Sequence, residues 1–167
     1  MATVIEATLV ISPPTDEILN LIHTAAIDIL DDVNAATDMP LTALAPRASC
    51  QEVEREFLNI HRRLIRHGYN SAVNRILDPI QIDPDGWDPQ TFVMFEGSFG
   101  IPPRTLAIII PIYKEREPLI EFLFEGQVVT VDWIIGAMIY MRGNSSLASD
   151  GCGKTAFIVF LFKTKIS

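Results

Sequence analysis

The fold class of this chain is decided near its C-terminus, by the unbroken apolar run Ala156-Phe-Ile-Val-Phe-Leu-Phe162. β-Branched and aromatic residues favour strands, and a strand that is apolar on both faces is typical of the covered centre of a sheet. A second run, Leu119–Glu125, alternates Ile120, Phe122 and Phe124 with glutamates, which predicts a strand with one wetter face. Together these runs predict a strand-rich C-terminal half.

Further strands are predicted around these two runs. Pro111 interrupts one of them, and because proline cannot donate to a sheet ladder, we expect that strand to be an edge strand or to carry a bulge. The connector 81–90 is rich in turn residues and separates this half from the preceding helices. The predicted strands are Phe92–Phe95, Leu106–Tyr113, Leu119–Glu125, Gln127–Trp133, Ile134–Met141 and Thr155–Lys163.

The N-terminal half is predicted to be mainly helical after a first strand at residues 3–11. Ser12 is a suitable N-cap, Pro13 suits the first helical position, and apolar residues at helical spacing continue to about Asn34. Residues 37–48 contain two prolines and are expected to form a loop.

A second helix is predicted over residues 50–67, with an apolar stripe on one face formed by Val53, Phe57, Ile60 and Leu64. Ser49 and Glu52 match a capping box, and Gly68 is a stop signal. A short third helix is expected at about Ser71–Leu77. The predicted fold class is therefore α+β, with an N-terminal strand and two to three helices packed on a mostly antiparallel sheet or a small β-barrel. One domain is expected over residues 1–167, with a helical part at about 12–78 and a strand-rich part at about 91–167.

Composition excludes several classes of function. The net charge is -8, and the first 50 residues hold a single base, Arg47, so neither nucleic acid nor an anionic membrane is an expected partner. Cys50 and Cys152 are too few and too far apart for a disulfide scaffold, although one bridge remains an alternative. No secretory signal is expected, because the first residues include Glu6 and lack a basic segment. These features predict a soluble, cytoplasmic protein.

The segment Ala148-Ser-Asp-Gly-Cys-Gly-Lys-Thr155 resembles a phosphate-binding loop. Such a loop needs a following helix and a downstream acid, but the residues after Thr155 are strand-like and contain no acid. A glycine-rich hairpin loop is the favoured interpretation, and no nucleotide cofactor is expected at Lys154 and Thr155.

Other candidate sites are also weak in the sequence. Asp83, Asp85 and Asp88 lie close together, but a calcium loop of the EF-hand type would need a closing glutamate where Phe92 stands. Cys152 would need a positioned base to act as a nucleophile. The three histidines, His23, His61 and His67, show no metal-ligand spacing, so no metal is expected.

The C-terminal half resembles the double-stranded β-helix of cupins and iron-dependent oxygenases. The likeness rests on the glycine-led strand Gly126-Gln-Val-Val129, a long apolar strand, and a final strand after a loop. The resemblance implies a metal-binding histidine on the strands, often followed by an arginine on the last strand. No histidine occurs from residue 68 onward, so a protein of this fold would lack the metal centre.

Two groups of residues are candidates for binding a partner. Arg55, Arg62 and Arg66 cluster on one face of the second predicted helix, where the simplest interpretation is a solvated face paired with glutamates and the alternative is docking of an acidic partner. Phe122, Phe124 and Trp133 belong to strands whose dense apolar character predicts self-association, with closure of the sheet within the chain as the alternative.

The favoured function is a non-catalytic interaction or assembly protein, viral or accessory, which acts through protein–protein contacts as a homo-oligomer and uses no cofactor. The lack of a recognisable catalytic constellation weighs against an enzyme. The alternative is a small-molecule enzyme or ligand-binding protein with a pocket between the helices and the β-rich core.

Overall fold

The computed structural model describes residues 3–5, 9–36, 40–67 and 89–163 of the chain. Within these residues nine strands form one sheet in which every strand pair is antiparallel. The helices are α1 (Asp16–Asp28), α2 (Leu30–Ala35) and α3 (Ala48–His67). The strands are β1 (Thr3–Ile5), β2 (Leu9–Ser12), β3 (Leu41–Ala43), β4 (Gln90–Gly100), β5 (Thr105–Lys114), β6 (Ile120–Phe124), β7 (Gln127–Val131), β8 (Met138–Arg142) and β9 (Ser146–Lys163).

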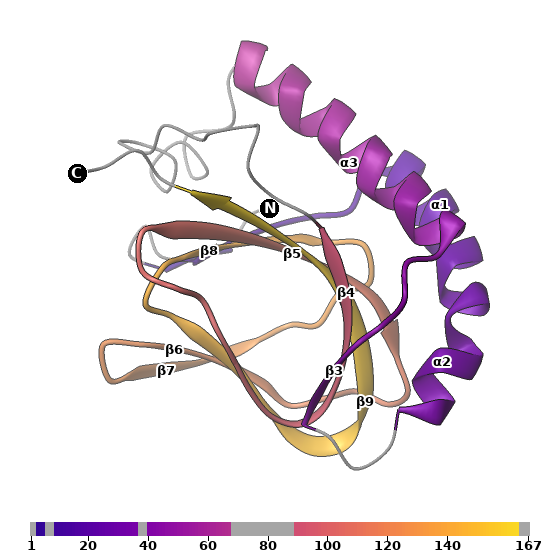
Figure 1. Ribbon diagram of the computed structural model, residues 1–167. Coiled ribbons are helices and arrows are strands. Elements are labelled where there is room, and N and C mark those ends of the chain that lie inside the picture. Colours follow the sequence, from indigo (N-terminus) through magenta and orange to yellow (C-terminus); the bar gives the residue numbers. More distant parts are fainter. Residues whose placement is uncertain (1–2, 6–8, 37–39, 68–88, 164–167) are drawn as a thin grey trace.

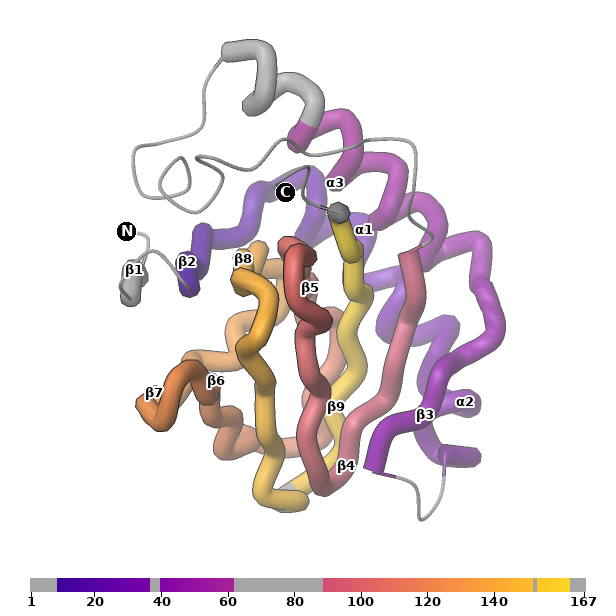
Figure 2. Tube along the Cα trace, turned by 60° about the vertical axis from the view of Figure 1, so that its left-hand side comes forward, coloured from indigo at the N-terminus to yellow at the C-terminus, as the bar shows by residue number. Residues whose placement is uncertain are grey.

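The sheet is curled, with the helices on one side and the β6–β7 hairpin on the other (Figure 1). The strand order is β1-β2-β8-β5-β9-β4-β3, and β9 lies at the centre between β5 and β4 (Figure 2). The first part of β9 pairs with β6 and its second part pairs with β5. This long strand therefore joins the two layers of the β core.

Apolar side chains alternate between the two faces of β9, as the sequence predicts for a strand that is covered on both sides. Ile158 and Phe160 face the helices, whereas Phe157 and Val159 face the interior of the curl, and all four are buried. One apolar layer thus lies between sheet and helices, and a second fills the space enclosed by the sheet.

Helix α3 packs on the sheet through one face. Val53, Phe57 and Ile60 are buried, and the ring centroids of Phe57 and Phe160 lie 4.4 Å apart. His61 is also buried on this face and stacks on Phe162, with centroids 5.0 Å apart. Because these contacts are made at helical spacing, they confirm the predicted second helix and its buried face at Val53, Phe57 and Ile60, whereas the side chain of Leu64 lies outside the described residues.

Two predicted helix caps are wrong. Ser12 ends β2, and the cap of α1 is Thr15, whose Oγ1 accepts a hydrogen bond from the Ile18 amide at 3.3 Å. The second helix begins at Ala48, so Ser49 lies inside the first turn, and its buried hydroxyl makes no hydrogen bond to a helix amide. Capping patterns locate a helix start to within a few residues, and tertiary packing decides which residue takes the role.

The predicted fold class is only roughly right. The helices are segregated from an antiparallel sheet, as expected, but strands dominate and curl into half of a barrel. The expected loop at 37–48 contributes the edge strand β3, and the predicted strand Ile134–Met141 begins only at Met138. The expected third helix, Ser71–Leu77, lies outside the described residues.

The curl closes the apolar strands within the chain, which was the alternative to self-association. Ile109, Ile120, Phe122 and Phe157 are buried together in the interior layer. The apolar strands therefore give no structural reason for an assembly, and the oligomeric state stays a prediction. Among the described helices, none is both long and apolar enough to cross a bilayer.

Candidate functional site

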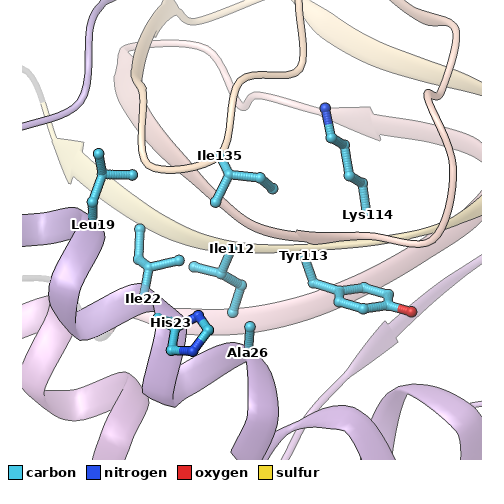
Figure 3. Close-up of a pocket in the computed structure, with 8 residues that line it drawn as sticks. All are labelled: Leu19, Ile22, His23, Ala26, Ile112, Tyr113, Lys114 and Ile135. Carbon is cyan, nitrogen blue, oxygen red and sulfur yellow. The ribbon is translucent and has the colours of Figure 1, made fainter.

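An open pocket of about 350 Å³ lies between α1 and the end of β5 (Figure 3). Its position matches the place predicted for a ligand in the alternative function, between the helices and the β-rich core. Most of its wall is apolar, and three polar side chains stand around it. The lining residues are Leu19, Ile22, His23 and Ala26 of α1, Ile112, Tyr113 and Lys114 of β5, and Ile135 of the connector before β8.

A β-bulge explains why three consecutive residues of β5 line the pocket. Pro111 pairs with Phe157 on β9, but Tyr113 pairs with Ala156, so Ile112 is the extra residue on β5. In a regular strand, neighbouring side chains point to opposite faces, and a bulge breaks that alternation. The bulge confirms one of the two places predicted for Pro111, since β5 is an interior strand rather than an edge.

The connector between β7 and β8 forms another wall of the pocket and is held closely against α1. The Gly136 amide donates to the Pro111 carbonyl oxygen at 2.8 Å. Gly136 has a φ of +83°, and a Cβ at this position would lie 2.9 Å from Leu19 Cδ2 and 3.4 Å from Ile22 Cδ1. Glycine is therefore required both by the backbone conformation and by the close approach of two pocket residues.

Lys114 provides the positive charge of the pocket. Its ammonium donates to the Glu117 carboxylate and, at 3.4 Å, to the carbonyl oxygen of Trp133 in the connector. The Lys114 side chain is 29% exposed, whereas that of Glu117 is 80% exposed. An ion pair with such an exposed partner is weak, so the Lys114 charge can be offered to another anion.

Sequence reasoning missed this site. Of its eight lining residues only His23 was considered for function, as a metal ligand, and it was set aside because the histidines lack metal-ligand spacing. The pocket combines alkyl side chains with an imidazole, a phenol and an ammonium group, which is the usual composition of a small-molecule site. The available signal was Pro111, since bulges are frequent beside active sites.

The arginines predicted to bind a partner are only partly described. Arg55 is exposed and pairs with Glu52 at 2.6 Å, which agrees with the simpler interpretation of a solvated helix face. The side chains of Arg62 and Arg66 lie outside the described residues. Partner binding by this face stays a prediction.

The aromatic residues predicted to bind a partner lie in the interior layer of the β core. Phe122 and Trp133 are buried, and Trp133 meets Phe157 edge-to-face with ring centroids 5.7 Å apart. Phe124 is partly buried against the same layer. Packing within the chain accounts for the apolar character of all three residues.

The glycine-rich segment that resembles a phosphate-binding loop is part of β9 rather than a hairpin loop. Strand structure continues through Gly151, Lys154 and Thr155, so no helix follows the glycines. Lys154 Nζ donates to the carbonyl oxygens of Val33 and Asn34, at 2.9 and 3.4 Å. The lysine of this segment therefore caps the C-terminus of α2.

The remaining polar candidates are dispersed or lie outside the description. His23 is exposed on α1 at the pocket, and His61 is buried between α3 and the sheet. The cluster Asp83–Asp88 and the side chains of His67 and Cys152 lie outside the described residues.

Comparison with known proteins identifies the fold. No family model and no curated protein matches the sequence. A prolyl-4-hydroxylase from Pseudomonas putida is 10% identical, with a TM-score of 0.59 over 95% of this chain and 93% of the other. A prolyl hydroxylase from Trichoplax adhaerens, in complex with a hypoxia inducible factor peptide fragment, is also 10% identical, with a TM-score of 0.59 over 95% of this chain and 84% of the other.

A third structure with this fold is the viral collagen prolyl hydroxylase of Paramecium bursaria Chlorella virus-1, in complex with 2-oxoglutarate. It is 11% identical, with a TM-score of 0.50 over 91% of this chain and 92% of the other. At these identities the likeness shows a shared fold alone. The resemblance that the C-terminal strands suggested was to a fold of cupins and iron-dependent oxygenases, and the comparison shows that this chain shares its fold with prolyl hydroxylases.

These structures contradict two predictions from the sequence. The favoured function, a non-catalytic interaction or assembly protein, is wrong, because the proteins that share the fold are hydroxylases and support the alternative of an enzyme or ligand-binding protein. The prediction that no metal is involved is contradicted as well, since prolyl hydroxylases share the fold of this chain. Absence of a local sequence motif was a poor guide to function.

The described side chains do not themselves fit an iron centre of the oxygenase type. Such a centre takes two histidines and one carboxylate. His61 lies on the helix side of the sheet, where it stacks on Phe57 and Phe162, and His23 is exposed on α1, so neither faces the interior layer of the β core. Among the side chains that the structure describes, no three His, Cys, Asp or Glu residues are grouped as metal ligands.

Proposed function

We propose that this protein binds a small organic molecule in the pocket between α1 and β5. The observation that carries the proposal is the bulge at Ile112, which lets three consecutive residues of β5, Ile112, Tyr113 and Lys114, line one mostly apolar pocket. Bulges beside binding sites re-aim side chains in this way. The pocket volume, about 350 Å³, lies within the range of small-molecule sites, roughly 300–1,000 Å³.

A fragment screen by NMR, with a matched pair of variants, tests this proposal. Ala26 lines the pocket, whereas Thr24 is exposed on the same helix and does not. Ala26→Phe should fill the pocket and remove fragment binding, and Thr24→Phe should leave it unchanged. Equal binding by both variants would place the fragments elsewhere. The proposal would be refuted if the screen found no fragment whose binding is lost in Ala26→Phe.

An enzyme of the hydroxylase type is the second candidate, and the shared fold is the observation that favours it. Calorimetry of the full chain with 2-oxoglutarate, with and without ferrous ion and in the absence of oxygen, tests this candidate. Metal-dependent binding of 2-oxoglutarate would support it. Heat equal to that of injection into buffer, in both titrations, would count against it.

A further inference from the structure

The charges around the pocket differ in sign from the net charge of the protein. The protein carries a net charge of -8, yet none of the eight residues that line the pocket is acidic. Lys114 contributes a half-buried ammonium group, and His23 contributes an imidazole. A cationic pocket on an acidic protein is complementary to an anion and disfavours a cation.

The partner of Lys114 indicates which kind of anion fits. The ammonium holds a carboxylate, that of Glu117, three residues further along the chain. Because the Glu117 side chain is 80% exposed, its ion pair with Lys114 is largely solvated and is worth little. A ligand carboxylate can therefore replace Glu117, which returns to water at small cost.

The rest of the pocket defines the body of the ligand. Five alkyl side chains form most of the wall, and burying apolar surface against them is favourable, at about 25 cal/mol per Å². Figure 3 shows Ile112 between the α1 side chains and Tyr113, with Lys114 at the far side of the pocket. The five alkyl residues are Leu19, Ile22, Ala26, Ile112 and Ile135.

We infer that the pocket binds an amphipathic monocarboxylate, a compact apolar body with one carboxylate, which displaces Glu117 from Lys114. The inference rests on the proposed function and specifies its ligand class. It distinguishes such a ligand from 2-oxoglutarate, which carries two carboxylates and little apolar surface. Octanoate has both required parts, and octanol has the same chain without the charge.

Calorimetry with octanoate, octanol and 2-oxoglutarate tests the inference. Octanoate should bind more tightly than the other two compounds. Lys114→Met should weaken octanoate by about tenfold or more, because it removes a hydrogen bond to a charged group, and should leave octanol unchanged. Lys154→Met is the matched control, since that lysine caps α2 and does not line the pocket.

Removing the competing carboxylate of Glu117 gives a second test, in which the affinity for octanoate should rise rather than fall. Glu117→Gln should tighten octanoate by about two- to fivefold, because the ligand no longer has to displace a paired carboxylate. Glu121→Gln makes the same chemical change on β6, outside the pocket lining, and should have no effect.

The outcomes separate the ligand class from the pocket itself. Equal binding of octanol and octanoate, or an octanoate affinity that Lys114→Met does not change, would overturn the inference. In that case fragment binding that is sensitive to Ala26→Phe would still support the proposed function. Absence of octanoate binding together with absence of such fragments would overturn both.

Discussion

Replacing Gly136 by alanine should separate two energetic terms that meet at the wall of the pocket. The first is the backbone term, since Gly136 has a φ of +83° and a residue with a Cβ loses about 1–2 kcal/mol in this region. The second is a packing term, because the new Cβ would lie 2.9 Å from Leu19 Cδ2 and 3.1 Å from Pro14 Cβ. Overpacking of this kind costs about 1–3 kcal/mol.

Gly126 provides the matched control. Its φ is +78°, nearly the same as that of Gly136, but nothing lies within 4 Å of the position where a Cβ would be. Gly126→Ala should therefore lose only the backbone term, about 1–2 kcal/mol. Gly136→Ala should lose about 2–5 kcal/mol, the sum of the two terms.

Urea unfolding measures the difference in stability between Gly136→Ala and Gly126→Ala. The comparison requires that the slope of the unfolding free energy against urea concentration is the same in both variants. The difference should be about 1–3 kcal/mol, and octanoate binding should weaken only in Gly136→Ala, because Leu19 and the connector must move apart. Equal loss of stability in the two variants would refute the close contact between the connector and α1 and, with it, this wall of the pocket.

Three further variants test the rest of the structure by urea unfolding. Burial raises the pKa of Glu54 from its ordinary 4.5 to about 7, so the free energy of unfolding should fall as pH rises through this window. Glu54→Gln should make this fall smaller by about 1–2 kcal/mol, a value reduced because Glu54 is partly exposed. Equal dependence of the unfolding free energy on pH in the variant and the unchanged protein would contradict this expectation. Lys154→Met should cost about 0.5–1.5 kcal/mol by freeing the Val33 and Asn34 carbonyl oxygens of α2, and no loss would exclude the cap. Ser49→Ala should change stability by less than about 0.5 kcal/mol, because the hydroxyl caps no amide, whereas a loss near 1 kcal/mol would restore it as a helix cap.

The apolar pattern of the sequence determined much of the fold by itself. The run at Ala156–Phe162 predicted a central strand covered on both faces, and β9 has that position. The stripe that includes Val53 and Phe57 predicted the buried face of α3. Both predictions held because apolar side chains are buried with a period of 2 residues in a strand or 3.6 residues in a helix, and this period can be read directly from the sequence.

Tertiary structure alone decided the caps and the curl of the sheet. Ser12 and Thr15 are both suitable caps by residue type. Thr15 caps α1, because Ser12 belongs to β2 and pairs with β8. The apolar strands required a cover, and the sequence left open whether another chain or the same chain would provide it. The bend of β9 toward β6 provides that cover within the chain.

The site depended on tertiary structure even more strongly. His23 and Lys114 are about ninety residues apart in sequence, and they line one pocket only because α1 crosses the end of β5. Pro111 signalled a bulge, but its register with β9 set which side chains turn toward the helix. The sequence shows which side chains are apolar and are therefore favourable to bury. Which polar groups from distant parts of the sequence come close in space depends on the path of the whole chain.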